Sequence, residues 1–372
     1  MSQVNGSGDG PAVRTRIGTI VGHGRPIGEI AGEIADLETV GLDSATFSEA
    51  YTFDAVSQLG YLAARTRTIE LATGILSVYA RTPTTTAMTA AGLDYVSDGR
   101  FRLGIGASGP QVVEGFHGVR YDAPLARTRE VIDICRQVWR RDKLVHAGKH
   151  YQVPLPAGLG TGEGKPLKLI NRPVRDRIPI TVAAIGPANV ELAAELAEGW
   201  EPIFFHPGAA RQVWGAALDA GAARRDPALG SLDVVVRLPL AVGEDTEPLL
   251  PQVRAKLALY IGGMGSRGHN FYNDLAVRYG YPEAAEKIQD LFLAGRMAEA
   301  AAAVPDDLVA ATALVGTVDQ LRERVTALRA AGVTLLNVEP LAAEHTRRVE
   351  DVAALRDLLD AHAHVPAVPA QS

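Results

Sequence analysis

The stretch GRFRLGIGASGPQVVEG, residues 99–115, decides how the whole chain is interpreted. It begins with a short apolar strand, residues 101–105, and continues as a loop rich in glycine. Gly104, Gly106 and Gly109 match the G-x-G-x-x-G pattern, in which backbone N–H groups of a dinucleotide-binding protein hold a phosphate. What this loop does depends on the fold that carries it.

The composition of the 372 residues is typical of a globular protein, with 47% hydrophobic and 22% charged residues. The net charge of −6 argues against a protein that binds nucleic acid, or a membrane surface through a basic face. No apolar run reaches the roughly 20 residues of a membrane span. Cys135 is the single cysteine, in a helical pattern, so we expect a packed thiol and a cytoplasmic location. No metal-binding motif appears, so no metal site is predicted.

Short apolar segments alternate with helical patterns along the chain. The expected strands are residues 16–21, 44–48, 69–78, 101–106, 180–184, 202–205, 234–242 and 334–338. Alternation of this kind indicates a parallel sheet, and eight closed units form a (β/α)8 TIM-like barrel. The longer cycles after strands four and seven predict insertions there, the second of them, about residues 249–314, mostly helical. We expect one barrel domain over residues 16–361, between a flexible arm (1–15) and a flexible tail (362–372).

The barrel changes the meaning of the glycine pattern. A dinucleotide-binding unit begins at its glycine loop, whereas three strand–helix units precede this one, and Pro110 and Gly115 interrupt the following segment. In a barrel the active site lies at the carboxyl ends of the strands, where such a loop can hold a phosphate. A glycine-rich turn that binds nothing is the alternative.

Five segments together resemble the bacterial luciferase-like superfamily, and most closely its coenzyme F420-dependent oxidoreductases, the methylenetetrahydromethanopterin reductase-like enzymes. They are SEAYTFD (48–54), TGILSVYARTP (73–83), DGRFRLGIGASGPQVVEGFHG (98–118), PLARTRE (124–130) and AAIGP (183–187). The resemblance covers roughly residues 16 to 340. It implies a TIM-like barrel that binds a deazaflavin at the strand ends and transfers a hydride between the deazaflavin and a small organic substrate. It also implies a homodimer.

The same resemblance implies where the cofactor lies. A bulge in the third strand, at Thr73, Gly74 and Ile75, would support the ring, often through a non-prolyl cis peptide bond. The phosphate and tail would meet two glycine-rich turns at strand ends. The first consists of Gly106, Ala107, Ser108, Gly109, Pro110 and Gln111, and the second of Ala184, Ile185, Gly186 and Pro187.

The acid–base group is less well defined by the sequence. Family members often carry an Asp-His pair at the end of the second strand, whereas this chain has Glu49 and Ala50. Glu49 and His117 are the candidate catalytic residues, and His23 and His206 also lie near strand ends. Each has a structural alternative, since an acid often caps a helix and a histidine often only packs.

Three functions stay open at this stage. The first is an F420-dependent oxidoreductase. The second is a monooxygenase of the same fold that uses reduced FMN and oxygen. The third is a barrel without catalytic activity that serves as a partner subunit.

Overall fold

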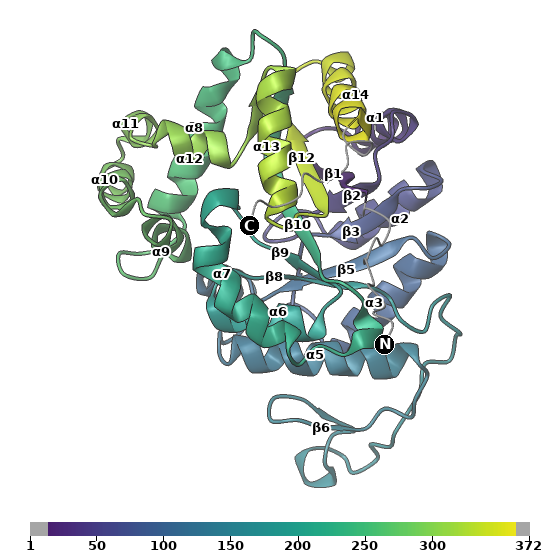
Figure 1. The fold of residues 1–372 in the computed structure, drawn as a ribbon. Helices are drawn as coiled ribbons and strands as arrows, with labels where there is room; N and C mark the ends of the chain where they lie inside the picture. Colours follow the sequence, from purple (N-terminus) through teal and green to yellow (C-terminus); the bar gives the residue numbers. More distant parts are fainter. Residues whose placement is uncertain (1–13, 362–372) are drawn as a thin grey trace, which may run out of the picture.

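The computed structural model describes residues 14–361, and its centre is a closed barrel of parallel strands surrounded by helices (Figure 1). The wall of the barrel consists of β1 (Arg16–Val21), β2 (Ser44–Phe47), β3 (Glu70–Thr73) continued by β4 (Leu76–Ser77), β5 (Phe101–Gly106), β8 (Ile180–Ala183), β9 (Gly199–Glu201), β10 (Asp233–Val242) and β12 (Leu335–Pro340). The pairs β1–β12 and β9–β10 close the ring. The predicted (β/α)8 barrel is therefore confirmed.

Helices cover the outside of this wall because each buries one apolar face against the strands. They are α1 (Ile27–Thr39), α2 (Ala55–Arg65), α3 (Pro83–Val96), α5 (Pro124–Trp139), α6 (Pro187–Leu196), α7 (Pro207–Ala222), α13 (Val318–Ala330) and α14 (His345–Ala361). Cys135 of α5 is fully buried, as predicted. Among residues 14–361, no helix is both long and apolar enough to cross a bilayer.

The prediction for the sixth strand is wrong. The sequence predicts residues 202–205, but the strand is β9, which ends at Glu201. Pro202 has no N–H to donate to a neighbouring strand, and Phe204 has a φ of 49°, outside the extended region. The chain therefore leaves the sheet directly after Glu201 and turns into α7.

Two long connections carry additional elements. Between β5 and β8 these are α4 (Pro110–Gly115), a hairpin of β6 (His146–Ala147) and β7 (Gln152–Val153), and η1 (Ala157–Leu159). The short connection between α7 and β10 contains η2 (Pro227–Leu229). Between β10 and β12 they are η3 (Glu247–Leu249), α8 (Leu250–Ala258), the π-helical turn η4 (Leu259–Gly263), α9 (Phe271–Arg278), α10 (Pro282–Leu293), α11 (Met297–Ala302), α12 (Asp306–Ala311) and the strand β11 (Leu314–Gly316), which sequence analysis missed. Figure 1 shows the β6 hairpin projecting beyond α5 and α9–α11 grouped at one side of the barrel.

Buried charges inside the barrel are paired. At its amino-terminal end Arg102, whose side chain is 8% exposed, donates to Glu70 at 2.8 Å and to Asp233 at 2.9 Å. A buried guanidinium without such partners would be strongly destabilising, so these three side chains form one unit.

A second set of ion pairs links the first and last helices of the barrel. Glu33 of α1 accepts hydrogen bonds from Arg348 of α14, with the Nε–Oε1 distance 3.0 Å, and Arg356 of α14 pairs with Asp43 before β2. These contacts lie beside the β1–β12 pairing. We call this region, α1 and β1 against β12 and α14, the seam.

The described part of the chain begins at Arg14, just before β1, and ends at Ala361, the last residue of α14. Residues 1–13 and 362–372, which include most of the predicted arm and all of the predicted tail, lie outside the described residues. Thr15 is buried, and its hydroxyl accepts a hydrogen bond from Arg329 at 2.8 Å. Contacts with the helices around the barrel thus include a residue that precedes β1.

Candidate functional site

The bulge in the third strand lies at the carboxyl end of the barrel wall. The Gly74–Ile75 peptide bond is cis and not prolyl, as the resemblance implied. The Gly74 N–H donates to the Phe47 carbonyl at 2.7 Å, and the Glu49 N–H donates to the Ile75 carbonyl at 3.3 Å. A Cβ atom at Gly74 would lie 2.4 Å from Thr46, so the bulge requires glycine.

The three glycines of the fingerprint have different surroundings. A Cβ atom at Gly104 would lie 1.7 Å from the Thr73 carbonyl oxygen, and one at Gly106 would lie 2.7 Å from the Ile75 side chain. A Cβ atom at Gly109 would meet nothing within 4 Å. The first two glycines therefore allow β5 to approach the bulge, and only Gly109 leaves open space.

The loop after β5 presents backbone N–H groups at its open side. Ser108 has a φ of 58°, a left-handed conformation that non-glycine residues seldom adopt. Gly109 caps α4 without a side-chain hydrogen bond, and Pro110 begins that helix. Because the helix has only six residues, the segment does not form the long helix of a dinucleotide-binding fold.

The turn after β8 lies next to this loop. β5 and β8 are neighbours in register, with Ile105 opposite Val182, so Ala107–Gln111 and Ala184–Pro187 leave adjacent strands at the same end. Gly186 caps α6, again without a side-chain hydrogen bond. Two indoles fix the turn, since Trp200 donates to the Ala184 carbonyl at 3.0 Å and Trp214 to the Ile185 carbonyl at 2.8 Å. The structure thus brings the predicted cofactor residues together on three neighbouring wall positions.

Glu49 lies beside the bulge and is held on all sides. Its carboxylate accepts two hydrogen bonds from Arg81, at 2.5 and 2.9 Å, and one from the Ala55 N–H at the start of α2, at 2.9 Å. The helix-capping role that sequence analysis offered as the alternative is therefore present. These partners fix the position of the Glu49 side chain beside the bulge.

The candidate histidines occupy three different places. His117 is half-buried with its ring 5.3 Å from that of Phe116, which in turn contacts Tyr51 beyond β2. His23 is exposed in the loop after β1. Burial lowers the pKa of His206, which lies against Tyr279 at the start of α7. Only His117 is linked through ring contacts to the segment that follows Glu49.

Sequence analysis missed the most connected side chain of the site, Arg237 of β10. Its guanidinium donates to Glu201 at 2.5 Å, to the Gly74 carbonyl at 2.6 Å and to the Ser48 hydroxyl at 3.3 Å. It therefore joins the ends of four strands. A single arginine within the apolar run Val234–Val242 was the available signal, because a charge in a barrel strand has to face a polar interior.

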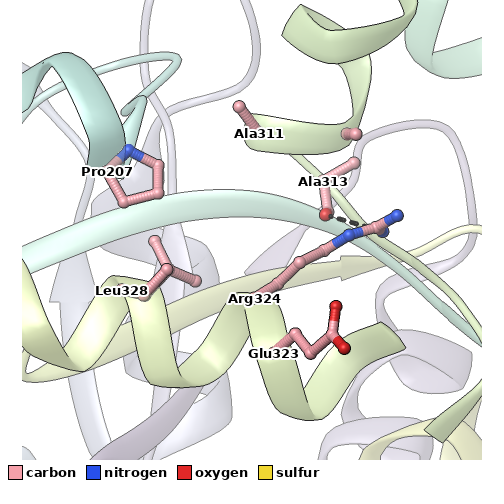
Figure 2. A pocket seen from close by; sticks show the side chains of 8 residues that line it. Pro207, Ala311, Ala313, Glu323, Arg324 and Leu328 are labelled. Atoms are coloured by element: carbon pink, nitrogen blue, oxygen red, sulfur yellow. Dashed lines mark hydrogen bonds between the residues drawn. The ribbon is translucent and has the colours of Figure 1, made fainter. Parts of the chain in front are cut away.

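One cavity among the described residues lies elsewhere. It has a volume of about 290 Å³, between α7, α12 and α13, and is lined mainly by small apolar side chains (Figure 2). Arg324 is the polar group pointing into it, and its guanidinium donates to the carbonyls of Ala313 and Val315. Because the Arg324 guanidinium is already bound to backbone and none of the predicted cofactor-binding or catalytic residues lines this cavity, it is separate from the site.

Comparison with known proteins agrees with this geometry. A model of the luciferase-like monooxygenase family matches residues 10–335. The chain belongs to this family. The bulge, the two glycine-rich turns and Arg237 are therefore features of a luciferase-like protein.

Two relatives and one solved structure extend the comparison. Rv3520c of Mycobacterium tuberculosis, provisionally named a coenzyme F420-dependent oxidoreductase, is 42% identical over 325 residues, covering 87% of this chain and 92% of its own. The 5,10-methylenetetrahydromethanopterin reductase of Archaeoglobus fulgidus is 29% identical over 303 residues, 80% of this chain and 85% of its own. The F420-dependent tetrahydromethanopterin reductase of Methanopyrus kandleri superposes with a TM-score of 0.75 at 22% identity, covering 91% and 97%. This last likeness shows the fold.

Proposed function

We propose that this luciferase-like protein is a coenzyme F420-dependent oxidoreductase that transfers a hydride between the deazaflavin and a small organic substrate. The observation that carries the proposal is the placement of the bulge and both glycine-rich turns on neighbouring wall positions. The F420-dependent names of its relatives support the choice of cofactor.

The residues present suit a bound deazaflavin. Ile75 and the glycines beside it offer an apolar surface without bulky side chains. The N-caps of α4 and α6 lack side-chain partners, and Gly109 opens onto free space, so backbone N–H groups there are available to a phosphate. F420 when bound supplies the hydride chemistry, and the protein contributes orientation and exclusion of water.

Glu49 and His117 are the proposed acid–base residues at this site. Arg81 and the α2 N-terminus hold the Glu49 side chain in one position, so its carboxyl group would stay in place near the ring. His117 would exchange the proton. We expect His117→Gln to remove one limb of the pH–rate profile, and a profile unchanged by the substitution would assign the proton transfer to another group.

The cofactor-binding loop can be tested directly at Gly109. We expect Gly109→Leu to abolish F420 binding, measured by quenching of F420 fluorescence, while the circular dichroism spectrum is retained. Gly158→Leu is the control, because Gly158 also faces open space, in the exposed helical turn η1. Unchanged affinity of the Gly109 variant would mean that this loop does not bind the phosphate.

An FMN-dependent monooxygenase is the second candidate, favoured by the family description itself. Parallel titrations with F420 and with reduced FMN separate the two. Tight FMN binding without F420 binding would overturn the first proposal. Failure to change the redox state of either cofactor, with any substrate, would favour a barrel without catalytic activity.

We also propose a cytoplasmic homodimer. The only charged residue of α3 is Asp94, which is buried, whereas Met88 and Tyr95 of the same helix are 57% and 72% exposed. An exposed helix face without charge is typical of a protein interface. Sedimentation of the wild type and of Tyr95→Asp tests this, since a dimer that dissociates in the variant is the expected result.

A further inference from the structure

Three aromatic rings come together beyond the carboxyl ends of β9 and β10. Phe204 follows β9, Tyr260 lies in η4 and Tyr272 lies in α9. Their ring centroids are 5.1 Å apart for Phe204 and Tyr260, 4.8 Å for the two tyrosines and 6.4 Å for Phe204 and Tyr272, all edge to face. We call these three residues the aromatic cap.

The chain holds the aromatic cap in place with unusual local structure. Asn270, which is 2% exposed, donates to the Tyr260 carbonyl at 3.0 Å and accepts from the Tyr272 N–H at 2.9 Å, so one side chain fixes both tyrosines. Phe204 adopts its left-handed backbone conformation while its carbonyl accepts a hydrogen bond from Tyr279 at 2.9 Å. Strained backbone and π-helical turns are frequent at ligand-binding sites.

The two tyrosine hydroxyls of the aromatic cap form no hydrogen bonds with the described residues. Within residues 14–361 the hydroxyls of Tyr260 and Tyr272 have no hydrogen-bond partner, whereas those of Tyr79, Tyr279 and Tyr281 all donate to oxygen atoms. Burial raises the pKa of Tyr272 to about 12 although Arg237 opposes this, so the phenol is a neutral donor at neutral pH.

Arg237 adds further donors and sets the charge of the region. Its electrostatic influence reaches both tyrosines, and its three protein hydrogen bonds leave two of its N–H groups without a partner among the described residues. Glu201 neutralises Arg237, and Lys256 neutralises Glu339 at the end of β12. The region therefore offers hydrogen-bond donors around a balanced charge, which favours a neutral acceptor over a carboxylate.

We infer that Tyr260, Tyr272 and Arg237 bind the carbonyl oxygen of a neutral, planar, conjugated substrate, such as an unsaturated ketone, whose flat face contacts the aromatic cap. This inference rests on the proposed function, because it assigns the substrate class to the same strand ends. The donors select an oxygen acceptor, the charge balance selects an uncharged molecule, and the rings select a planar one.

The test uses benzylideneacetone, with cinnamate and 4-phenyl-2-butanol as charged and non-planar counterparts, titrated by saturation-transfer NMR against the full chain with and without F420. We expect the ketone to bind best. Tyr260→Phe and Tyr272→Phe should each weaken its binding about three- to tenfold, the value of one neutral hydrogen bond, without changing F420 affinity. Tyr61→Phe, at an exposed tyrosine of α2, is the matched control and should change neither.

The outcomes separate the two proposals. A chain that binds F420 but binds cinnamate as well as the ketone, or whose tyrosine variants bind the ketone unchanged, overturns the substrate class and leaves the cofactor proposal standing. Ketone binding that depends on both tyrosines in a chain that fails to bind F420 supports the substrate class and overturns the cofactor. Binding of none of the three probes to the F420-loaded chain also refutes the inference.

Discussion

The replacement Gly104→Ala should destabilise the barrel far more than Gly109→Ala, although both glycines belong to the same fingerprint. The added methyl group at Gly104 would lie 1.7 Å from the Thr73 carbonyl oxygen, which is backbone and cannot rotate away. β5 would have to move away from β3. That movement breaks the two 2.9 Å hydrogen bonds between the Thr73 hydroxyl and the Gly104 backbone.

The magnitude follows from these contacts. Overpacking costs about 1–3 kcal/mol and each lost hydrogen bond about 1 kcal/mol, so the free energy of unfolding should fall by about 3–5 kcal/mol. With an unfolding entropy of about 0.7 kcal/mol/K for a chain of this size, the melting temperature should fall by roughly 4–7 °C. Gly109 has a φ of −110°, which alanine adopts freely, so Gly109→Ala should stay within about 0.5 kcal/mol of the wild type.

Urea denaturation and thermal melting of the two variants test this reasoning. Equal stability of the Gly104 and Gly109 variants would show that β5 tolerates a side chain at the bulge, and the close approach of backbone would then not explain the first glycine. Retained F420 binding by Gly109→Ala together with its loss in Gly109→Leu would further show that the loop limits the size of the side chain.

Three other predictions concern buried groups. Arg237→Met should lower the free energy of unfolding by about 3–5 kcal/mol, measured with urea, because it leaves Glu201 buried without its partner; a smaller loss in the double variant Arg237→Met/Glu201→Met would confirm the pairing. Burial alone would raise the pKa of Glu33, but hydrogen bonds from Arg348 and Arg25 lower it to about 2, so its stabilisation is complete above about pH 4.5 and is lost as the pH falls toward 2. Glu33→Gln should therefore flatten the acid limb of the stability–pH curve by an amount on the order of 3 kcal/mol, and an unchanged limb would contradict the assignment. Burial raises the pKa of Cys135 to about 12, so a thiol reagent should titrate no cysteine in the native chain and one after denaturation, whereas rapid native labelling would show that α5 opens.

The alternation of strands and helices could be predicted from the sequence because each strand is a short apolar run between turns, as at Phe101–Gly106. The bulge could be predicted too, since Gly74 interrupts the apolar run of the third strand. The sixth strand was misplaced because residues 202–205 are more apolar than the true strand Gly199–Glu201, which contains a glutamate, and the backbone conformation of Phe204 is not visible in the sequence. Hydrophobic patterns do not encode that difference.

The site was less predictable for a different reason. Gly109 and Gly186 follow strands directly, so their place at the strand ends could be inferred. The aromatic cap could not, because Phe204, Tyr260 and Tyr272 come from three elements whose approach is set by Asn270 and the π-helical turn. Nothing local in the sequence marks residues that meet only through tertiary packing.

The seam has a consequence for how this protein is made. β1 begins at Arg16, and its partner β12 begins at Leu335, so the barrel cannot close until more than 300 further residues have left the ribosome. Until then β1 has an unpaired edge, which is prone to aggregation. The ion pairs from α14 to Glu33 and Asp43 form in the same late step. A chain truncated before β12 should therefore keep this edge exposed and aggregate, whereas a chain truncated between β12 and α14 should close the barrel but lose the ion pairs to Glu33 and Asp43.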